Sequence, residues 1–320
     1  MNASAPPVAV GRAVPPKERP GAARQSPRRR RSGGGEPRWA PYGFITPFFL
    51  LFLPFGAGSI LLAVAMAFLS WPLGRAPSFT GFDNFRAVLF DPVFRTGMWN
   101  TLRMLVVFLM ILIPLAIFVA VAINQLGRRT VNVVQIVLFA PVTMSLIAVS
   151  VIFSLLYDDN VGLLNNMLRG LGLSGLPFLT SPDFAPWAIV AMRVWRVLGY
   201  YAIMLYAGLQ SIPDELYEAA AIDGAGWWSR LWHITLPMLQ PVTLFVLVAA
   251  SVASWEVFAE PNVLTDGGPA RSTYTAVMYI FETSFGKFNL GRGAAASVLL
   301  AIAIISTTLI VSRLLRSRHQ

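Results

Sequence analysis

The amino-acid sequence predicts an all-α membrane protein with six transmembrane helices. Of its 320 residues, 56% are hydrophobic and only 12% are charged, and the mean hydropathy is +0.62. In addition, several long stretches without any charged residue have the length needed to cross a bilayer. A soluble core could not enclose so much apolar surface, so lipid is the expected solvent for most of the chain.

Residues 1–38 have a different composition and are expected to be disordered. They contain nine of the 25 basic residues, including the run from Arg28 to Arg31, and many prolines. Such a segment buries too little apolar area to offset the entropy lost on ordering. The arginine run allows three interpretations: a topogenic charge that also contacts anionic lipid, a targeting signal, or a nucleic-acid arm. We favour the topogenic role and expect no nucleic-acid partner.

Residues 39–320 form the predicted membrane domain, and uncharged stretches place four of its spans. Residues 43–70 carry no charge over 28 positions. At about 1.5 Å per residue, this length exceeds a hydrocarbon core of roughly 30 Å. Uncharged stretches at 104–123, 131–157 and 293–312 predict further spans at about 100–124, 131–157 and 291–313.

Two weaker segments complete the set of six spans. Residues 186–211 include Arg193 and Arg196 near their start, and residues 238–263 are uncharged only as far as Trp255. An even number of spans leaves the basic tail and the basic C-terminal end on one side of the membrane. The positive-inside rule makes that side the cytoplasm.

The sequence offers few groups for catalysis or for metal binding. It has no cysteine, and its only histidines are His233 and His319. It also lacks the Gly-x-x-x-x-Gly-Lys-Ser/Thr loop that cradles nucleotide phosphates. We therefore expect no enzyme, no catalytic residue, no metal site and no cofactor in this chain.

A polar loop at residues 212–237 separates the fourth and fifth predicted spans. Ser211, Pro213 and Asp214 predict a helix start, with serine as the cap, proline in the first turn and an acid close behind. Gly224 predicts a helix end, because glycine reaches positive φ without steric cost. A second short helix is then expected before Leu236-Pro237 ends the loop.

The segment from Glu218 to Ala225, followed by Ile234-Thr235-Leu236-Pro237, resembles the signature loop of one transporter family. These are the permease subunits of binding-protein-dependent ATP-binding-cassette importers, whose pattern is Glu-Ala-Ala, two residues, Asp-Gly-Ala, then a distal Ile, Leu and Pro. The resemblance implies that the loop forms coupling helices that sit in a cleft of a cytoplasmic ATPase. The residues that would carry this role are Glu218, Ala219, Ala220, Asp223, Gly224 and Ala225.

Matching pieces extend the resemblance over most of the chain. They are Phe82-Asp83-Asn84-Phe85, Trp195 with Gly199, and Leu264-Thr265-Asp266-Gly267-Gly268-Pro269 with Ser272-Thr273. They are similar to the carbohydrate-type permeases related to the larger maltose permease subunit, which implies the fold of type I importer permeases. The sequence departs from the family at Trp227, Trp228, Trp232 and Asp266, which leaves open which ATPase fits.

The resemblance also implies a function and a set of partners. The chain would be the membrane-spanning subunit of an ATP-driven importer for a mono-, di- or oligosaccharide, with sn-glycerol 3-phosphate or a related polyol as the alternative. Its partners would be a second permease in a heterodimer, two ATPase subunits that bind the ATP, and an extracytoplasmic substrate-binding protein. It would lie in the plasma membrane of a prokaryote with both termini in the cytoplasm. Three outer loops are long enough either to form a docking surface for the binding protein or to form interfacial helices: 71–99, 158–185 and 262–292.

An interfacial helix pair at the lipid headgroups is the alternative interpretation of loop 212–237. A lipid-binding helix prefers lysine and arginine on its polar face. This loop instead contains Asp214, Glu215, Glu218 and Asp223, which suit a basic protein partner better than an anionic leaflet.

Candidates for the substrate pathway lie in the fourth and fifth predicted spans. Trp255 beside Glu256 suits a polyhydroxylated ligand, because the ring covers C–H surface while the carboxylate accepts from hydroxyls. For Glu256, an ion pair with Arg193 or Arg196 is an equally good alternative to a ligand contact. The two arginines line the cavity or, as we favour, snorkel to the outer interface. Glu260, one turn after Glu256, is expected to snorkel outward.

A rival function is a self-sufficient secondary transporter or channel in which an intramembrane glutamate is the proton or ion site. Such a protein has no need of the acidic loop. A membrane-embedded enzyme is a weaker alternative, because no nucleophile and base pair or metal-ligand cluster is visible.

Overall fold

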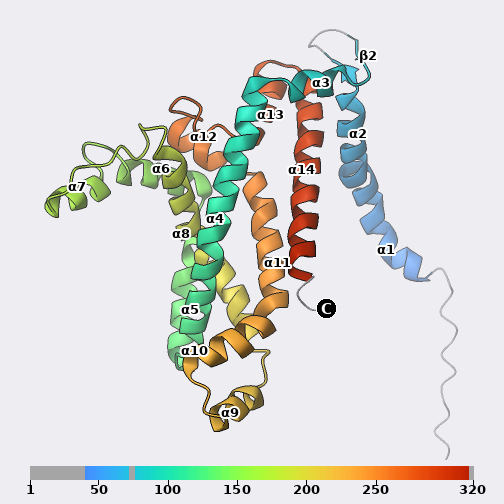
Figure 1. Cartoon of the computed structure of the whole chain (residues 1–320). Coiled ribbons are helices and arrows are strands. Elements are labelled where there is room, and N and C mark those ends of the chain that lie inside the picture. The colour runs from blue at the N-terminus through green and yellow to red at the C-terminus, as the bar shows by residue number, and fades with distance from the viewer. Residues whose placement is uncertain (1–39, 72–75, 317–320) are drawn as a thin grey trace, which may run out of the picture. The chain divides into compact units, whose positions relative to one another are not determined.

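A computed structural model describes residues 40–71 and 76–316 (Figure 1). The predicted disordered tail lies outside these residues. The chain divides into two compact units, Met1–Gly56 and Ala57–Gln320. In the described part of the first unit, α1 (Ala40–Leu51) leads into the π-helical segment η1 (Phe52–Ala57). The largely apolar side chains from Ile45 to Phe55 are exposed, as expected of a helix in lipid.

The second unit is almost entirely helical in its described part. Its first elements are α2 (Gly58–Ala67), an antiparallel hairpin of β1 (Leu69–Ser70) and β2 (Ser78–Phe79), α3 (Asp83–Leu89) and α4 (Pro92–Asn124). The middle part contains α5 (Arg128–Thr143), α6 (Leu146–Leu156), α7 (Leu163–Gly170) and α8 (Ala185–Leu209). The last part contains α9 (Asp214–Ile222), α10 (Trp227–Arg230), the π-helical η2 (Leu231–Thr235), α11 (Leu236–Trp255), α12 (Ala259–Thr265), α13 (Ala276–Phe281), the π-helical η3 (Glu282–Gly286) and α14 (Leu290–Arg316).

The short elements of this unit lie at its two ends. Figure 1 shows α3, α12 and α13 at one end of the long helices and α9 at the other. We call these the outer end and the inner end, after the orientation predicted from the sequence.

Five helices in the described residues are long and apolar enough to cross a membrane. They are Ile45–Ala67, Pro92–Asn124, Ala185–Leu209, Trp227–Trp255 and Leu290–Arg313. The pair Arg129–Thr143 and Leu146–Leu156 passes the same test together, although its two halves are bent by 93°. With this pair counted as one broken span, the number agrees with the six predicted spans.

The third predicted span is a bent helix pair and not the continuous helix expected over 131–157. Met144 and Ser145 adopt extended backbone, with ψ of 149° and 127°, so the helical hydrogen bonds stop there. The chain resumes as α6 in a new direction. The absence of charged residues from 131 to 157 gave no signal for this break, because both halves satisfy the length and charge requirements of a span together.

The fifth predicted span differs from the structure at both ends. Its helix starts at Trp227, because the chain stays helical through η2 and through Pro237, which lies in the first turn of α11. The helix stops at Trp255, eight residues before the predicted end at 263, and Phe258 leaves helical geometry with φ of −141°. The chain then turns into α12. Glu256 and Glu260 therefore do not share one continuous helix.

The main core lies between α4, α8 and α11. Buried side chains such as Phe108, Leu205 and Val246 belong to one apolar cluster that joins these three helices. Gly199 lets α5 approach α8 closely, because a Cβ atom at this position would clash with the carbonyl oxygen of Leu138. The close helix contact thus requires glycine here.

Candidate functional site

α9 and the turn that follows it contain all six residues predicted to contact an ATPase. No residue of α9 is buried, and the side chain of Ile222 is 87% exposed. The predicted serine cap is wrong, because α9 begins at Asp214 with Pro213 in the cap position. Ser211 lies too far back along the chain and donates its hydroxyl hydrogen to the carbonyl of Gly208 at 2.7 Å.

Gly224 ends α9 as the sequence predicts. Its φ is +77°, and two hydrogen bonds close the helix end: the amide of Ala225 donates to Ala220 at 2.8 Å and that of Gly224 donates to Ala221 at 3.1 Å. This pair of bonds, with a left-handed glycine between helix and loop, is the Schellman motif. Nothing lies within 4 Å of the place where a Cβ of residue 224 would be, so backbone conformation alone selects glycine.

The acidic side chains of this loop are free to meet a partner. Asp214, Glu215, Glu218 and Asp223 are exposed, and none of them forms an ion pair with another described residue. Four carboxylates on so short a segment create a negative patch. Such a patch attracts and orients a positively charged surface.

The loop is connected to the long helices in two ways. The hydroxyl groups of Tyr217 in α9 and Thr235 in η2 form a hydrogen bond of 3.0 Å. In addition, the helix that begins at Trp227 continues without interruption to Trp255 at the outer end. A displacement of the loop can therefore be transmitted along one continuous helix.

Three indole rings lie beside the acidic patch. Trp227 and Trp228 pack edge to face, with centroids 4.6 Å apart, and Trp232 follows one turn later. All three side chains are exposed. The inner end thus presents apolar area next to its negative charge.

The predicted substrate-pathway residues do not come together as one open site. Trp255 is only 3% exposed and packs in a cluster with Leu105, Ala276 and Leu300. Its ring offers little area to a ligand in this conformation. Glu256 is exposed and forms no ion pair among the described residues. A substrate contact by these two residues stays a prediction.

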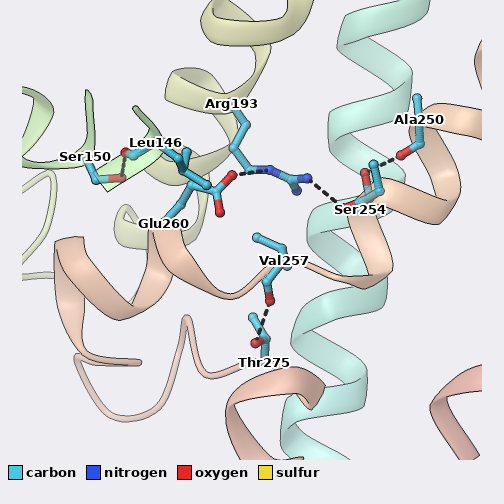
Figure 2. A network of polar contacts seen from close by, with 9 residues as sticks. Leu146, Ser150, Arg193, Ala250, Ser254, Val257, Glu260 and Thr275 are labelled. Atoms are coloured by element: carbon cyan, nitrogen blue, oxygen red, sulfur yellow. Dashed lines mark hydrogen bonds and ion pairs between the residues drawn. The ribbon is translucent and has the colours of Figure 1, made fainter. Parts of the chain in front are cut away.

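Arg193 is buried in a network of polar contacts, which corrects the expectation that it snorkels outward (Figure 2). Its Nε lies 3.2 Å from Oε1 of Glu260, and its Nη2 donates to the carbonyl of Ala253 at 3.3 Å. The guanidinium also lies 4.7 Å from the centroid of the Phe108 ring. One side chain of α8 therefore contacts α4, α11 and α12.

The ion pair with Arg193 that was expected of Glu256 is formed by Glu260. The prediction that Glu260 points outward is wrong. Its side chain is 8% exposed. The reason is the break after Trp255, which redirects the chain so that α12 brings Glu260 back toward α8. Arg196 makes a weaker contact, from Nη1 to the carbonyl of Val142 at 3.5 Å, and is half-buried.

Sequence reasoning missed a second polar network, which attaches the outer loop to α4. The side-chain amide of Asn100 donates to the carbonyls of Arg271 at 2.7 Å and Tyr274 at 2.9 Å, and Arg103 donates to the carbonyl of Ser272 at 2.6 Å. The sequence signal for this network was the presence of two polar residues, Asn100 and Arg103, near the start of an otherwise apolar helix. The sequence did not indicate their partners, which lie about 170 positions away.

Two tyrosines fix carboxylates in this outer region. Tyr274 donates to Glu282 at 2.5 Å, and this hydrogen bond, with Lys287 at 2.9 Å, lowers the pKa of Glu282. Burial raises the pKa of Tyr279 to about 12, and its hydrogen bond to Asp91 at 2.8 Å acts in the same direction. Glu282 is therefore ionised and hydrogen-bonded near neutral pH.

The sequence matches a known protein family and several named relatives. Residues 112–318 match the family described as binding-protein-dependent transport system inner membrane component. Over 277 residues, the chain is 35% identical to the arabinooligosaccharides transport system permease protein AraP of Bacillus subtilis, covering 86% of this chain and 88% of that protein. It is 34% identical over 251 residues to the sn-glycerol-3-phosphate transport system permease protein UgpA of Rhizobium meliloti, covering 77% and 84%.

A solved structure is similar over nearly the same length. It is the crystal structure of a bacterial alginate ABC transporter in complex with an alginate pentasaccharide-bound periplasmic protein. The matched chain superposes with a TM-score of 0.77 at 25% identity, covering 88% of this chain and 96% of that chain.

Proposed function

Because this chain belongs to the family of inner membrane components of binding-protein-dependent transport systems, we propose that it is the permease subunit of an ATP-driven sugar importer. The observation that carries the proposal is α9, an acidic helix without buried residues at the inner end of a continuous membrane-length helix. The expected role of the permease is transport, with no chemistry of its own.

The substrate class rests on the relatives. AraP is named for arabinooligosaccharides, and the similar solved structure is that of an alginate transporter. We therefore propose a mono-, di- or oligosaccharide as the substrate. UgpA is named for sn-glycerol 3-phosphate, which keeps that compound, or a related polyol, as the second candidate.

In the proposed coupling, a basic surface of a cytoplasmic ATPase receives α9. Glu218 and Asp223 supply the anionic contacts, and the small side chains of Ala219, Ala220 and Ala225 allow close approach. Gly224 provides the bend. ATP binding draws two ATPase subunits together, and the helix from Trp227 to Trp255 carries that movement outward as a rigid body.

The proposed assembly has partners on both sides of the membrane. A second permease completes a heterodimer, and two ATPase subunits bind the ATP at the inner end. A substrate-binding protein docks at the outer end, on loops 71–99, 158–185 and 262–292. The proposed location is the plasma membrane of a prokaryote, with both termini in the cytoplasm.

Charge reversal at Glu218 tests the coupling. The permease with Glu218→Lys is expressed with its ATPase and partner permease, and membrane insertion, co-purification of the ATPase and sugar uptake are measured. We expect normal insertion and a loss of ATP-driven uptake, because a lysine repels the basic docking surface. For insertion and co-purification, the matched control is Asp183→Lys, an exposed acid in a loop at the opposite end, which should leave the ATPase contact unchanged. Normal uptake by Glu218→Lys would contradict the coupling role.

A further inference from the structure

A hollow at the outer end has the features of a ligand site. It has a volume of about 450 Å³ and lies between α12, the loop from Asp266 to Tyr274, α13 and η3. Phe258, Asn262 and Asp266 line it at intervals of four residues, so one face of α12 and the turn after it is turned toward it. Volumes of roughly 300 to 1,000 Å³ are typical of small-molecule sites.

Three polar side chains at this hollow have no hydrogen-bonding partner among the residues that the structure describes. The side chains of Asn262 and Asp266 make no hydrogen bond or ion pair there. The guanidinium of Arg271 lies 5.8 Å from the centroid of the Tyr274 ring and interacts with the carboxylate of Glu282 only through its charge. Together they offer an amide, a carboxylate and a guanidinium to a ligand.

The loop that carries these groups is held in an unusual conformation. Asp266 and Arg271 have positive φ values of 48° and 58°, which non-glycine residues adopt rarely. Hydrogen bonds maintain the loop: Thr265 and Thr273 join at 2.7 Å, and Asn100 donates to the carbonyl of Arg271 at 2.7 Å. Strained residues that are fixed by their surroundings are common at ligand sites.

Aromatic rings supply the apolar part of the hollow. The rings of Phe258 and Phe281 lie 5.1 Å apart, and both residues line the hollow. The side chain of Phe281 is 51% exposed, although it has ring neighbours on two sides. A ring face beside hydrogen-bonding groups fits a sugar, whose C–H surface covers the ring while its hydroxyls bond to the polar groups.

The charges of the hollow favour an uncharged ligand. Both carboxylate oxygens of Glu282 already have partners, Tyr274 and Lys287. Among the described residues that line the hollow, the remaining charges are the carboxylate of Asp266 and the guanidinium of Arg271, which balance each other. A neutral polyol can bond to both groups, whereas an anionic ligand that pairs with Arg271 would be repelled by the carboxylate of Asp266.

We propose that this hollow binds one unit of a neutral sugar as it leaves the binding protein and before it enters the membrane-spanning part. The inference rests on the proposed function, because it takes a sugar as the transported substrate. The outer loop would thus hold a transfer site of its own, in addition to any surface that contacts the binding protein.

Site-specific labelling tests the binding directly. The chain has no cysteine, so Asn262→Cys introduces a single thiol, with Asp183→Cys as the exposed control elsewhere at the outer end. The assembled transporter without binding protein is treated with a membrane-impermeant maleimide in the presence of lactose, diacetylchitobiose, arabinooligosaccharides or sn-glycerol 3-phosphate. We expect at least one neutral sugar to slow labelling at 262 severalfold and to leave the control unchanged. Unchanged labelling with every neutral sugar, or protection by the glycerol phosphate alone, would overturn the proposal.

Uptake kinetics separate a sugar site from a docking surface. Asp266→Asn removes the charge but keeps a residue type that tolerates positive φ. Arg271→Gln removes the guanidinium. Its matched control is Arg129→Gln, because Arg129 is an exposed arginine of α5 that lies outside the hollow and outside the three loops proposed for docking.

In proteoliposomes that contain the whole assembly, uptake is measured against the concentration of sugar-loaded binding protein. We expect Asp266→Asn and Arg271→Gln each to lower the maximal rate by about tenfold, as the loss of one hydrogen bond to a charged group predicts, without changing the half-saturating concentration of binding protein. A changed half-saturating concentration with an unchanged maximal rate would instead identify a docking surface and overturn the proposal. If the wild-type assembly imports no sugar at all, the proposed function fails, and the labelling result alone then decides whether the hollow binds sugar.

Discussion

Removal of one partner of the Arg193–Glu260 pair should destabilise the protein strongly. Both side chains are 8% exposed, and their charged atoms lie 3.2 Å apart. Substitution of Glu260 by methionine leaves the guanidinium of Arg193 buried without its counter-charge. Substitution of Arg193 by methionine leaves the carboxylate in the same situation.

The expected magnitude follows from the burial of the pair. Loss of one partner of a buried ion pair costs about 3–5 kcal/mol, because an uncompensated charge remains in a poorly solvated place. Replacement of both partners by apolar side chains of similar volume is often neutral or stabilising. The double variant Arg193→Met/Glu260→Met should therefore be more stable than either single variant.

The assay is thermal unfolding of the purified assembly in detergent, followed by tryptophan fluorescence for the wild type, both single variants and the double variant. Arg196→Met is the control, since its contact with Val142 at 3.5 Å is long and its side chain is only half-buried. We expect the control to cost about 1 kcal/mol or less. Single variants that are as stable as the control, or a double variant that loses the sum of both effects, would refute the reasoning.

Three further substitutions test other parts of the structure. Gly199→Ala should destabilise the protein by about 1–3 kcal/mol in the same unfolding assay, because its methyl group would meet a carbonyl of α5, whereas Gly127→Ala has open space. Gly224→Ala should cost about 1 kcal/mol, because its φ is +77°, and should reduce co-purification of the ATPase. The pKa of Glu282 is lowered below its ordinary 4.5, mainly by Tyr274. The stability that this carboxylate contributes is therefore present above pH 4.5 and is lost as the pH falls through the lowered pKa. Glu282→Gln should flatten this part of a stability curve measured from about pH 6 to about pH 3.

Much of the fold could be predicted from composition and charge alone. Uncharged stretches identified the spans because a bilayer requires about 20 apolar residues for each crossing. Gly224 could be predicted as a helix end because only glycine reaches positive φ without cost. The acidic loop between the fourth and fifth spans could be predicted from the same distribution of charged residues, because its charges interrupt an apolar pattern.

The residues that the sequence placed wrongly depend on contacts between distant segments. The break after Trp255 is followed by Glu256, Glu260 and Pro261, which are equally compatible with the outer end of one helix, so Glu260 was expected to continue outward along that helix. Its actual partner, Arg193, lies 67 positions earlier in the chain. Pattern reasoning cannot choose between such partners, because it records spacing within one helix and not the packing of α8 against α12.

The central claim is that ATP hydrolysis by separate subunits drives sugar import through this chain, and reconstituted transport tests it most directly. The permease, its partner permease, the ATPase and the binding protein are placed in proteoliposomes, and uptake of radiolabelled sugar is measured with ATP, without ATP, and with an ion gradient alone. The account predicts uptake only when ATP and the binding protein are both present. Uptake by the permease alone under an ion gradient would contradict it and support a secondary transporter.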